Sequence, residues 1–408
     1  MKKITVLCLT LFLIFTLTAC SGSSLPAGST STNLPQTSNT TLSVSDSSTE
    51  NGTLITLGKN ITIEGNGAQA NGNVVNITDG GTYTISGELN SGQVDVNTKE
   101  KVTLNLNGVN ITNPSGPALQ ITDAKKVTLN LMEGSINTLA DGKSNNENDA
   151  AIFTNDTLVI EGSGTLIVTG NNQEGISSDD DLIIEGGVIK ITALDDGLNA
   201  HDDITINGGY LYISAGGDAV DSNGTLNING GMTIAMGSTA PGDGGVDAEG
   251  LFTLTGGTLI ATGNADAAPG SDSSQYSVYI NAGSNQAAGT IFHIEQDGQE
   301  IMTFAPARSY QTIFFSSPDL VNDGVYQVNF GGSANNADEF GFFDSDSYTA
   351  VGESSNVSVT AAITPAGVGG MGVGGGMGGP GGGMGGRGGP GGGMMPPDGA
   401  EPPQFDNN

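Results

Sequence analysis

Short runs of apolar and polar residues follow one another along the chain between residues 51 and 364, each bounded by Gly, Asn or Asp. One example is the run from Leu182 to Ile184, which stands directly before the turn sequence Glu185-Gly186-Gly187. Runs of this length and composition are typical of short β-strands joined by tight turns. Because no stretch combines a sustained helical period with capping residues, the pattern predicts an all-β fold.

The runs repeat with a fixed period. Glu174, Asp196 and Asp218 occupy equivalent places in three successive units, each 22 residues after the last. A fourth copy starts at Gly245 after a four-residue insertion, and a looser copy precedes the set at Ala151. Repeats of this length without helices form solenoids, because one unit cannot bury its apolar face alone. We therefore predict a right-handed parallel β-helix, with the hand taken from the general bias of parallel crossovers.

Stacking of the units predicts which side chains face inward. The equivalent aliphatic residues Ile176, Leu198, Val220 and Val246 would form one interior column, about 4.8 Å apart from rung to rung. A β-propeller is the main rival fold, but its blades are about twice as long as these units. Calcium-binding nonapeptide repeats have a different period and are excluded.

The segments on either side of the repeats depart from the period. Strand-like runs continue through residues 276–364 and also through residues 51–117. A solenoid needs a cap at each end, because its last rung otherwise exposes unpaired backbone groups. We therefore predict that residues 51–275 form the β-helix and that residues 276–364 form a C-terminal β cap of the same domain.

The N-terminal residues indicate export. Lys2 and Lys3 precede an apolar run that is too short for a membrane span and is typical of a secretory signal. The run ends in Leu-Thr-Ala followed by Cys20, which resembles the lipobox of bacterial lipoproteins. We expect residues 1–19 to be removed and Cys20 to carry a lipid that anchors the protein to the extracellular face of the cell membrane. The alternative is an ordinary signal peptide that happens to contain a cysteine.

Two segments of biased composition flank the predicted domain. Residues 20–50 are mostly Ser, Thr and Asn, and we expect a flexible linker because they cannot bury enough apolar surface to order the chain. Residues 365–408 are rich in Gly, Met and Pro without the collagen period, which predicts a disordered tail. The second cysteine, Cys8, would leave with the signal, so no internal disulfide is expected in the mature chain.

The net charge of the chain limits the classes of partner that it can bind. The formal net charge is -32, which excludes a general electrostatic attraction to nucleic acid or to anionic lipid. Contact with the membrane is therefore expected only through the N-terminal lipid. Residues 174–263 contain fourteen Asp and Glu but a single cationic side chain, that of Lys190. Carboxylates stacked about 5 Å apart repel each other by roughly 3 kcal/mol per pair, and side-chain cations are too few to offset this.

A hard divalent cation would neutralise the stacked carboxylates. Oxygen donors from Asp, Asn and turn carbonyls suit Ca²⁺, which tolerates irregular coordination. We predict that Ca²⁺ ions bridge adjacent rungs, with ligands drawn from Glu174, Asp196, Asn199, Asp218, Asp221, Asp243 and Asp247. The alternative is a solvated acidic edge that holds ions only diffusely.

Three side chains beside this edge are candidates for contact with a sugar. Tyr210 and Tyr212 alternate along one strand and so share a face, and Lys190 lies one repeat away from Tyr212. Tyrosine offers a flat apolar ring and a hydroxyl group, and the ammonium group could meet a uronate. The alternative is that these side chains only pack beneath a neighbouring loop.

Several motifs resemble a known family. They are Gly81 to Gly87, Val102 to Val109, Gly116-Pro117-Ala118, Glu133 to Leu139, Tyr310 to Ile313, Ser316 to Leu320 and Gly331-Gly332. Together they resemble the secreted bacterial carbohydrate-binding β-helix family, which is similar in structure to polysaccharide lyases. The resemblance implies a right-handed parallel β-helix with bound calcium that adheres to cellulose-like and pectic polysaccharides without established catalysis.

Catalysis is the first alternative to binding. Elimination of uronates needs Ca²⁺ and a strong base, usually Arg or Lys, yet Arg308 and Arg387 both lie outside the repeats. Hydrolysis needs two carboxylates in distinct environments, and neither Asp195-Asp196 nor Asp202-Asp203 stands out as such a pair. We therefore expect a monomeric protein that binds polysaccharide without cleaving it. The alternatives are a calcium-dependent lyase or glycoside hydrolase, and a surface adhesin that contacts protein.

Overall fold

A computed structural model describes residues 52–143, 148–264, 266–345, 347–360 and 363–367. The regular elements of these residues are all β-strands, as predicted. Within these ranges no helix has the length and apolar content needed to cross a membrane. The predicted signal peptide, Cys20, the linker and residues 368–408 of the predicted tail lie outside the described residues.

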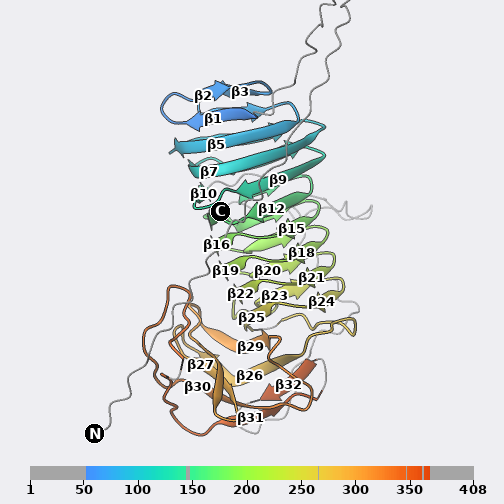
Figure 1. Cartoon of the computed structure of the whole chain (residues 1–408), viewed down its shortest axis with the longest axis vertical. Coiled ribbons are helices and arrows are strands. Elements are labelled where there is room, and N and C mark those ends of the chain that lie inside the picture. The colour runs from blue at the N-terminus through green and yellow to red at the C-terminus, as the bar shows by residue number, and fades with distance from the viewer. Residues whose placement is uncertain (1–51, 144–147, 265, 346, 361–362, 368–408) are drawn as a thin grey trace, which may run out of the picture. The chain divides into compact units, whose positions relative to one another are not determined.

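The strands stack in parallel, rung upon rung, and so confirm the predicted β-helix (Figure 1). The first face consists of β1 (Thr53–Leu57), β5 (Gly81–Leu89), β7 (Lys101–Asn113), β10 (Ile136–Asp141), β13 (Thr165–Gly170), β16 (Val188–Ala193), β19 (Tyr210–Ser214), β22 (Met232–Met236) and β25 (Thr258–Gly263). Each of these strands pairs in parallel with the next one.

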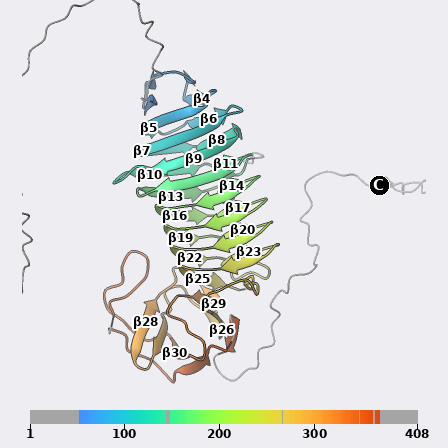
Figure 2. The same cartoon turned by 45° about the vertical axis from the view of Figure 1, so that its right-hand side comes forward.

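The second face is a separate sheet of nine strands, whose column is visible in Figure 2. It consists of β3 (Ala68–Asn71), β4 (Val74–Ile77), β6 (Gln93–Asn97), β8 (Leu119–Asp123), β11 (Ala150–Thr154), β14 (Glu174–Ser178), β17 (Leu198–Ala200), β20 (Val220–Ser222) and β23 (Val246–Ala248). The third face consists of β9 (Lys126–Leu131), β12 (Leu158–Gly162), β15 (Leu182–Ile184), β18 (Ile204–Ile206), β21 (Leu226–Ile228) and β24 (Phe252–Leu254). The long strand β7 pairs with both β9 and β10 and so joins the first and third faces.

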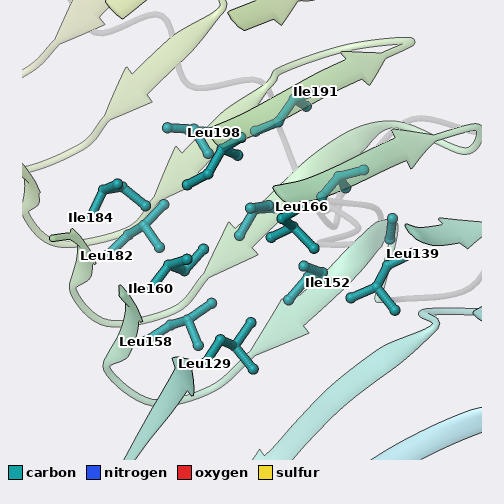
Figure 3. Packing of buried hydrophobic residues seen from close by; sticks show 14 of the residues in the cluster. Leu129, Leu139, Ile152, Leu158, Ile160, Leu166, Leu182, Ile184, Ile191 and Leu198 are labelled. Carbon is teal, nitrogen blue, oxygen red and sulfur yellow. The ribbon is translucent and has the colours of Figure 1, made fainter. Parts of the chain in front are cut away.

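The interior is filled by aliphatic columns. Ile176, Leu198, Val220 and Val246 are in register on the second face and are at most 1% exposed, as predicted. Figure 3 shows the same stacking on the third face, where Leu158 lies beside Leu182, and Ile160 beside Ile184. Burial alternates along each strand because successive side chains point to opposite sides of a sheet.

Paired glycines close the turn between the third and first faces. The second glycine of each pair has a positive φ, for example 88° at Gly209 and 77° at Gly231. A Cβ atom added to Gly231 would lie 2.5 Å from the carbonyl oxygen of Gly209, one rung away. Glycine recurs at this position because its conformation and the close stacking of backbones both exclude a side chain.

The C-terminal strands leave the solenoid and become antiparallel. β29 (Tyr310–Ser316) pairs with both β25 and β26 (Ser277–Gln286), and β32 (Ile363–Gly367) pairs in parallel with β26. β28 (Gln299–Phe304), β27 (Phe292–Gln296), β30 (Val325–Phe330) and β31 (Ser355–Ser358) form a second antiparallel sheet. At the other end, β2 (Thr62–Glu64) pairs antiparallel with β1, and β3 with β4.

A second hydrophobic core lies between the last rungs and these strands. Ile234, Met236 and Ile260 point away from the solenoid interior and pack with Phe292 and Phe315, among others. β29 also covers the edge of β25, so the backbone groups of this last strand of the first face are paired. Residues from 277 onward therefore cap the solenoid. β32 extends to Gly367, three residues past the predicted end of the cap.

Candidate functional site

The predicted metal ligands lie in the turns that lead from the first face to the second, as Asp196 and Asp218 do, and on the second-face strands that follow, as Asn199 and Asp221 do. We call this row the acidic edge, and its members are Asp149, Glu174, Asp196, Asn199, Asp218, Asp221, Asp243, Asp247 and Asp266. Backbone hydrogen bonds hold successive turns one above the other, since the amide of Gly175 donates to the Asp196 carbonyl (2.9 Å) and that of Gly197 to the Asp218 carbonyl (3.0 Å). The predicted column of side chains at successive turns is therefore present.

A second column runs beside the first on the outer side of the second face. Asn199 is in register with Asp221, and Asp221 with Asp247. The amide nitrogen Nδ2 of Asn199 donates a hydrogen bond to Oδ2 of Asp221 at 3.1 Å. Asp243 lies in the insertion before the fourth repeat, and its charge adds a small contribution to the raised pKa of Asp196, of which burial is the main cause.

Two carboxylates of the acidic edge also fix the stacking of the turns. Oδ1 of Asp196 accepts the backbone N–H of Asp218 at 2.7 Å, and Oδ1 of Asp218 accepts the backbone N–H of Gly244 at 2.5 Å. Each carboxylate thus uses one oxygen to hold the next rung.

The electrostatics of the acidic edge favour protonation or a bound cation. Burial raises the pKa of Glu174 to about 9, with a further contribution from a hydrogen bond and charge repulsion from Asp149. Burial followed by repulsion from Asp196 raises the pKa of Asp218 to about 9 and that of Asp221 to about 7. Burial also raises the pKa of Asp196 itself to about 6.

Side-chain cations do not neutralise these groups. Within the described residues, the ion pairs formed by Lys, Arg and His involve other carboxylates, such as Lys99 with Asp123 and Lys190 with Glu339. Oε2 of Glu174 is buried and has no hydrogen-bond partner among the same residues. A buried carboxylate oxygen without a partner is costly, and oxygen donors of this kind are those that a hard divalent cation such as Ca²⁺ prefers.

Sequence reasoning missed two members of the acidic edge. Oδ1 of Asp266 accepts the backbone N–H groups of Gly245 (2.8 Å) and Val246 (3.1 Å), and burial raises its pKa to about 6. Asp266 stands one period after Gly244, so continuing the repeat by one unit would have found it. Asp149 accepts a hydrogen bond from the side chain of Gln173. It precedes the residue in register with Glu174, but it lies in a looser repeat where the motif is hard to align.

A second acidic cluster lies at the next turn, between the second and third faces. One carboxylate oxygen each from Asp180, Asp181 and Asp202 lies within 4.8 Å of the others. Oδ1 of Asp181 accepts the backbone N–H of Asp203 at 3.3 Å, and Oδ2 of Asp180 accepts the hydroxyl hydrogen of Thr157 at 2.6 Å. These contacts give the cluster a role in holding the turn.

Lys190, Tyr210 and Tyr212, the side chains predicted to contact a sugar, lie close together on the first face, and a loop packs on them. Lys190 is in register with Tyr212 on the first face. The ring of Phe340 packs on Tyr210 and Tyr212 at centroid distances of 4.4 and 5.7 Å. Nζ of Lys190 lies 4.7 Å from the same ring centre and 2.6 Å from Oε2 of Glu339. A loop thus packs on these side chains, as in the alternative noted above, while all three stay partly exposed, and their contact with a sugar stays a prediction.

Replacing Phe340 with alanine is expected to lower the free energy of unfolding by about 1–2 kcal/mol, because a half-buried ring and its aromatic contacts are lost. Burial raises the pKa of Tyr210, so that pKa should also fall toward its ordinary value in the variant. Urea denaturation and a spectrophotometric tyrosine titration measure the two effects. The control is Val351→Ala, because Val351 is 67% exposed. Equal stability of the two variants would contradict the assigned contact.

Three comparisons relate this chain to known proteins. The family model described as "Carbohydrate-binding domain-containing protein" matches residues 71–339, more than half of the chain. A protein of the same description from Acetivibrio thermocellus is 38% identical over 128 residues, which is 29% of this chain and 45% of that protein. The chain thus spans less than half the length of this relative.

A solved structure is also similar. It is described as the polysaccharide lyase-like protein from C. thermocellum, gadolinium derivative, and it is 30% identical to this chain with a TM-score of 0.43. The alignment covers 51% of this chain and 93% of that one. The match to the family model agrees with the resemblance drawn from the sequence motifs. The chain belongs to the family of carbohydrate-binding domain-containing proteins.

Proposed function

We propose that this protein binds polysaccharide without cleaving it, through Ca²⁺ held at the acidic edge. The observation that carries the proposal is the row of partly buried carboxylates without side-chain cations, in a chain that belongs to a carbohydrate-binding family. Glu174, Asp196, Asn199, Asp218 and Asp221 are the residues that would hold the ions. The relative's description as a carbohydrate-binding protein supports a polysaccharide partner.

Calcium also accounts for the class of glycan that we propose. A chain with a formal charge of -32 repels an acidic polymer unless a cation lies between them. Ca²⁺ takes six to eight oxygen ligands, so ions held by protein carboxylates can keep positions for sugar oxygens. Pectic polysaccharides, whose uronate units supply such oxygens, fit this edge. We propose cellulose-like glycans as the second class of partner.

For the localisation and the oligomeric state of the protein, we propose what the sequence predicts. We propose a monomer on the extracellular face of the cell membrane, attached only through a lipid on Cys20. The acidic edge would then face polysaccharide outside the cell. A globomycin-sensitive shift in gel mobility, lost on Cys20→Ala, would support the anchor, and an unchanged shift in that variant would contradict it.

Retention on immobilised polygalacturonate tests the proposed function. We expect retention in millimolar CaCl₂ and release by EDTA. Asp221→Asn should weaken binding at least tenfold, because loss of a group that only orients a ligand already reduces metal affinity by about 10–100-fold, and loss of a charged ligand should cost no less. The control is Asp272→Asn, since Asp272 is exposed and outside the acidic edge. If neither EDTA nor Asp221→Asn changes the retention, the assignment of glycan binding to Ca²⁺ at the acidic edge is wrong.

Cleavage is the alternative, and one observation bears on it. The backbone N–H of Ala307 lies 3.3 Å from Sδ of Met236, so the next residue, Arg308, lies closer to the repeats than the sequence suggested. Burial lowers the pKa of Arg308, but a guanidinium group stays protonated at neutral pH and makes a poor base. Lys190 is engaged with Glu339. Incubation with polygalacturonate and Ca²⁺ should yield neither unsaturated product nor new reducing ends.

The remaining alternative is an adhesin that contacts protein. A glycan array separates it from the proposed function. Calcium-dependent signals on plant-type polysaccharides support glycan binding. An array without signals would favour adhesion to protein.

A further inference from the structure

A groove lies on the second face beside the start of the acidic edge, since Asn148, the residue before Asp149, is among its lining residues. Its volume is about 530 Å³, within the range of about 300–1,000 Å³ that small-ligand sites occupy. The strands β4, β6 and β8 and the turns before them supply its lining, which includes Asn73, Ser91, Gln93, Asn113, Pro117 and Gln120. None of the lining residues in the described part of the chain is charged. In a chain with a formal charge of -32, an uncharged groove is a distinct chemical environment.

Hydrogen bonds hold the amide side chains of the groove in place. Nε2 of Gln93 donates to the Pro117 carbonyl and to Oε1 of Gln120, both at 3.0 Å. Nε2 of Gln120 in turn donates to Oγ1 of Thr122 at 3.0 Å. Nδ2 of Asn73 donates to the carbonyl of Ser91 at 2.8 Å. The bonds of Gln93 and Asn73 connect neighbouring rungs and that of Gln120 lies within β8, so the groups are oriented before a ligand arrives.

The backbone beneath the groove is equally constrained. A Cβ atom added to Gly92 would lie 2.3 Å from the carbonyl oxygen of Asn73. The amide of Gln93 donates to that same carbonyl at 3.1 Å, and the amide of Gly92 donates to the Thr112 carbonyl at 3.2 Å. The turn that carries Gln93 is therefore fixed between the rungs on either side.

The same amides keep hydrogen-bonding capacity for a ligand. Within the described residues, Oε1 of Gln93 and Oδ1 of Asn73 accept no hydrogen bond, whereas Nε2 of Gln120 donates only one of its two hydrogens. The groove thus presents acceptors and a donor side by side. Sugar hydroxyl groups both donate and accept hydrogen bonds, so they complement such a set. Val74, which is partly exposed, adds apolar surface for the C–H groups of a sugar ring.

The absence of charged side chains narrows the ligand class. A phosphate or a uronate needs a cationic partner or a metal ion, and a metal ion needs carboxylates, yet the described lining supplies neither. An uncharged carbohydrate is the class that matches the amides, the apolar patch and the volume.

We propose that this groove is a second glycan site, which binds uncharged sugar units without calcium. It goes beyond the proposed function, because neither the acidic edge nor a metal ion takes part. β4, β6 and β8 belong to the same sheet as β14, β17 and β20, which border the acidic edge. One face of the solenoid therefore presents a neutral site and a calcium-dependent site.

Titration calorimetry in EDTA tests this second site, with cellohexaose, xylohexaose and mannohexaose as probes. At least one uncharged hexasaccharide should bind in EDTA. Gln93→Met removes the free acceptor Oε1 at nearly constant length and should weaken that binding at least tenfold. Asn73→Ala should weaken it similarly, and it provides a second variant at an exposed position that is tolerant of substitution. Thermal melts of both variants check that they fold.

The variant at each site serves as the control for the other site, so the neutral groove and the acidic edge can be tested independently. Asp221→Asn should leave hexasaccharide binding in EDTA unchanged while it weakens retention on polygalacturonate. Gln93→Met should leave that retention unchanged, so failure of one site does not imply failure of the other. The proposal is overturned if no hexasaccharide binds in EDTA. It is also overturned if folded Gln93→Met and Asn73→Ala variants both bind as the unmodified protein does.

Discussion

Replacing Leu198 with alanine is expected to lower the free energy of unfolding by about 3–5 kcal/mol. Leu198 is fully buried and stands in the interior column between Ile176 and Val220 (Figure 3). The truncation leaves a cavity that the rungs on both sides cannot fill, because their own side chains are fixed by the parallel register. In a solenoid each rung is stabilised by its two neighbours, so one truncation weakens two interfaces.

Urea denaturation followed by far-UV circular dichroism measures the effect. Leu194→Ala is a matched control, because Leu194 lies four positions earlier in the same repeat and is 59% exposed. Its loss should change the free energy of unfolding by less than about 0.5 kcal/mol. Comparable losses for the two variants would mean that the assigned interior column is wrong.

The repeated part of the fold could be predicted because its contacts follow the sequence period. Asn199 and Asp221 are 22 residues apart, which is the length of one repeat. Their side chains therefore meet on adjacent rungs. The aliphatic column and the Gly-Gly turns follow from the same spacing. Local pattern and long-range contact coincide in a solenoid, so one implies the other.

Contacts between residues that are not one repeat apart leave no pattern in the sequence. Lys190 and Glu339 form an ion pair across 149 positions, and nothing near Phe340 indicates that its loop returns to the first face. The sequence offered two interpretations of Tyr210 and Tyr212, and it did not show that a loop packs on them.

The neutral groove escaped sequence reasoning for a related reason. Its rungs differ in length, since Val75 is in register with Val94, 19 positions later, whereas Val94 is in register with Leu119, 25 positions later. Without a fixed offset, the amides from three strands could not be aligned into one surface. Their lack of charge also gave no electrostatic reason to group them.

In the absence of divalent cations, the protein is expected to melt at a higher temperature at pH 5 than at pH 8. The folded-state pKa values of Glu174, Asp218 and Asp221 are raised to about 9, 9 and 7, above the ordinary range near 4. Between about pH 4 and pH 9 the folded state therefore binds more protons than the unfolded state, and stability falls as pH rises through this window. A loss of several kcal/mol corresponds to about 5–10 °C, at about 2–4 °C per kcal/mol.

Calcium is expected to reverse this trend. Ca²⁺ binds the deprotonated carboxylates, so it should raise the melting temperature strongly at pH 8 and weakly at pH 5, where protons compete for the same oxygens. Differential scanning calorimetry at both pH values, with CaCl₂ or with EDTA, measures the four melting temperatures. An equal effect of Ca²⁺ at the two pH values would argue for diffuse ion binding in place of bound ions.

Asp218→Asn is expected to change the melting temperature in opposite directions in EDTA and in CaCl₂, and so to distinguish the calcium-free acidic edge from the calcium-bound one. The asparagine keeps an oxygen that can accept the backbone N–H of Gly244 but needs no proton, whereas Asp218 must take one up on folding at pH 8, because burial and then repulsion from Asp196 raise its pKa to about 9. In EDTA at pH 8 the variant should therefore melt higher than the unmodified protein. In CaCl₂ it should melt lower, because a ligand is lost, whereas Asp272→Asn should change neither value. Lower stability in EDTA as well would show that the Asp218 carboxylate stabilises the fold without calcium, contrary to its assignment as a metal ligand.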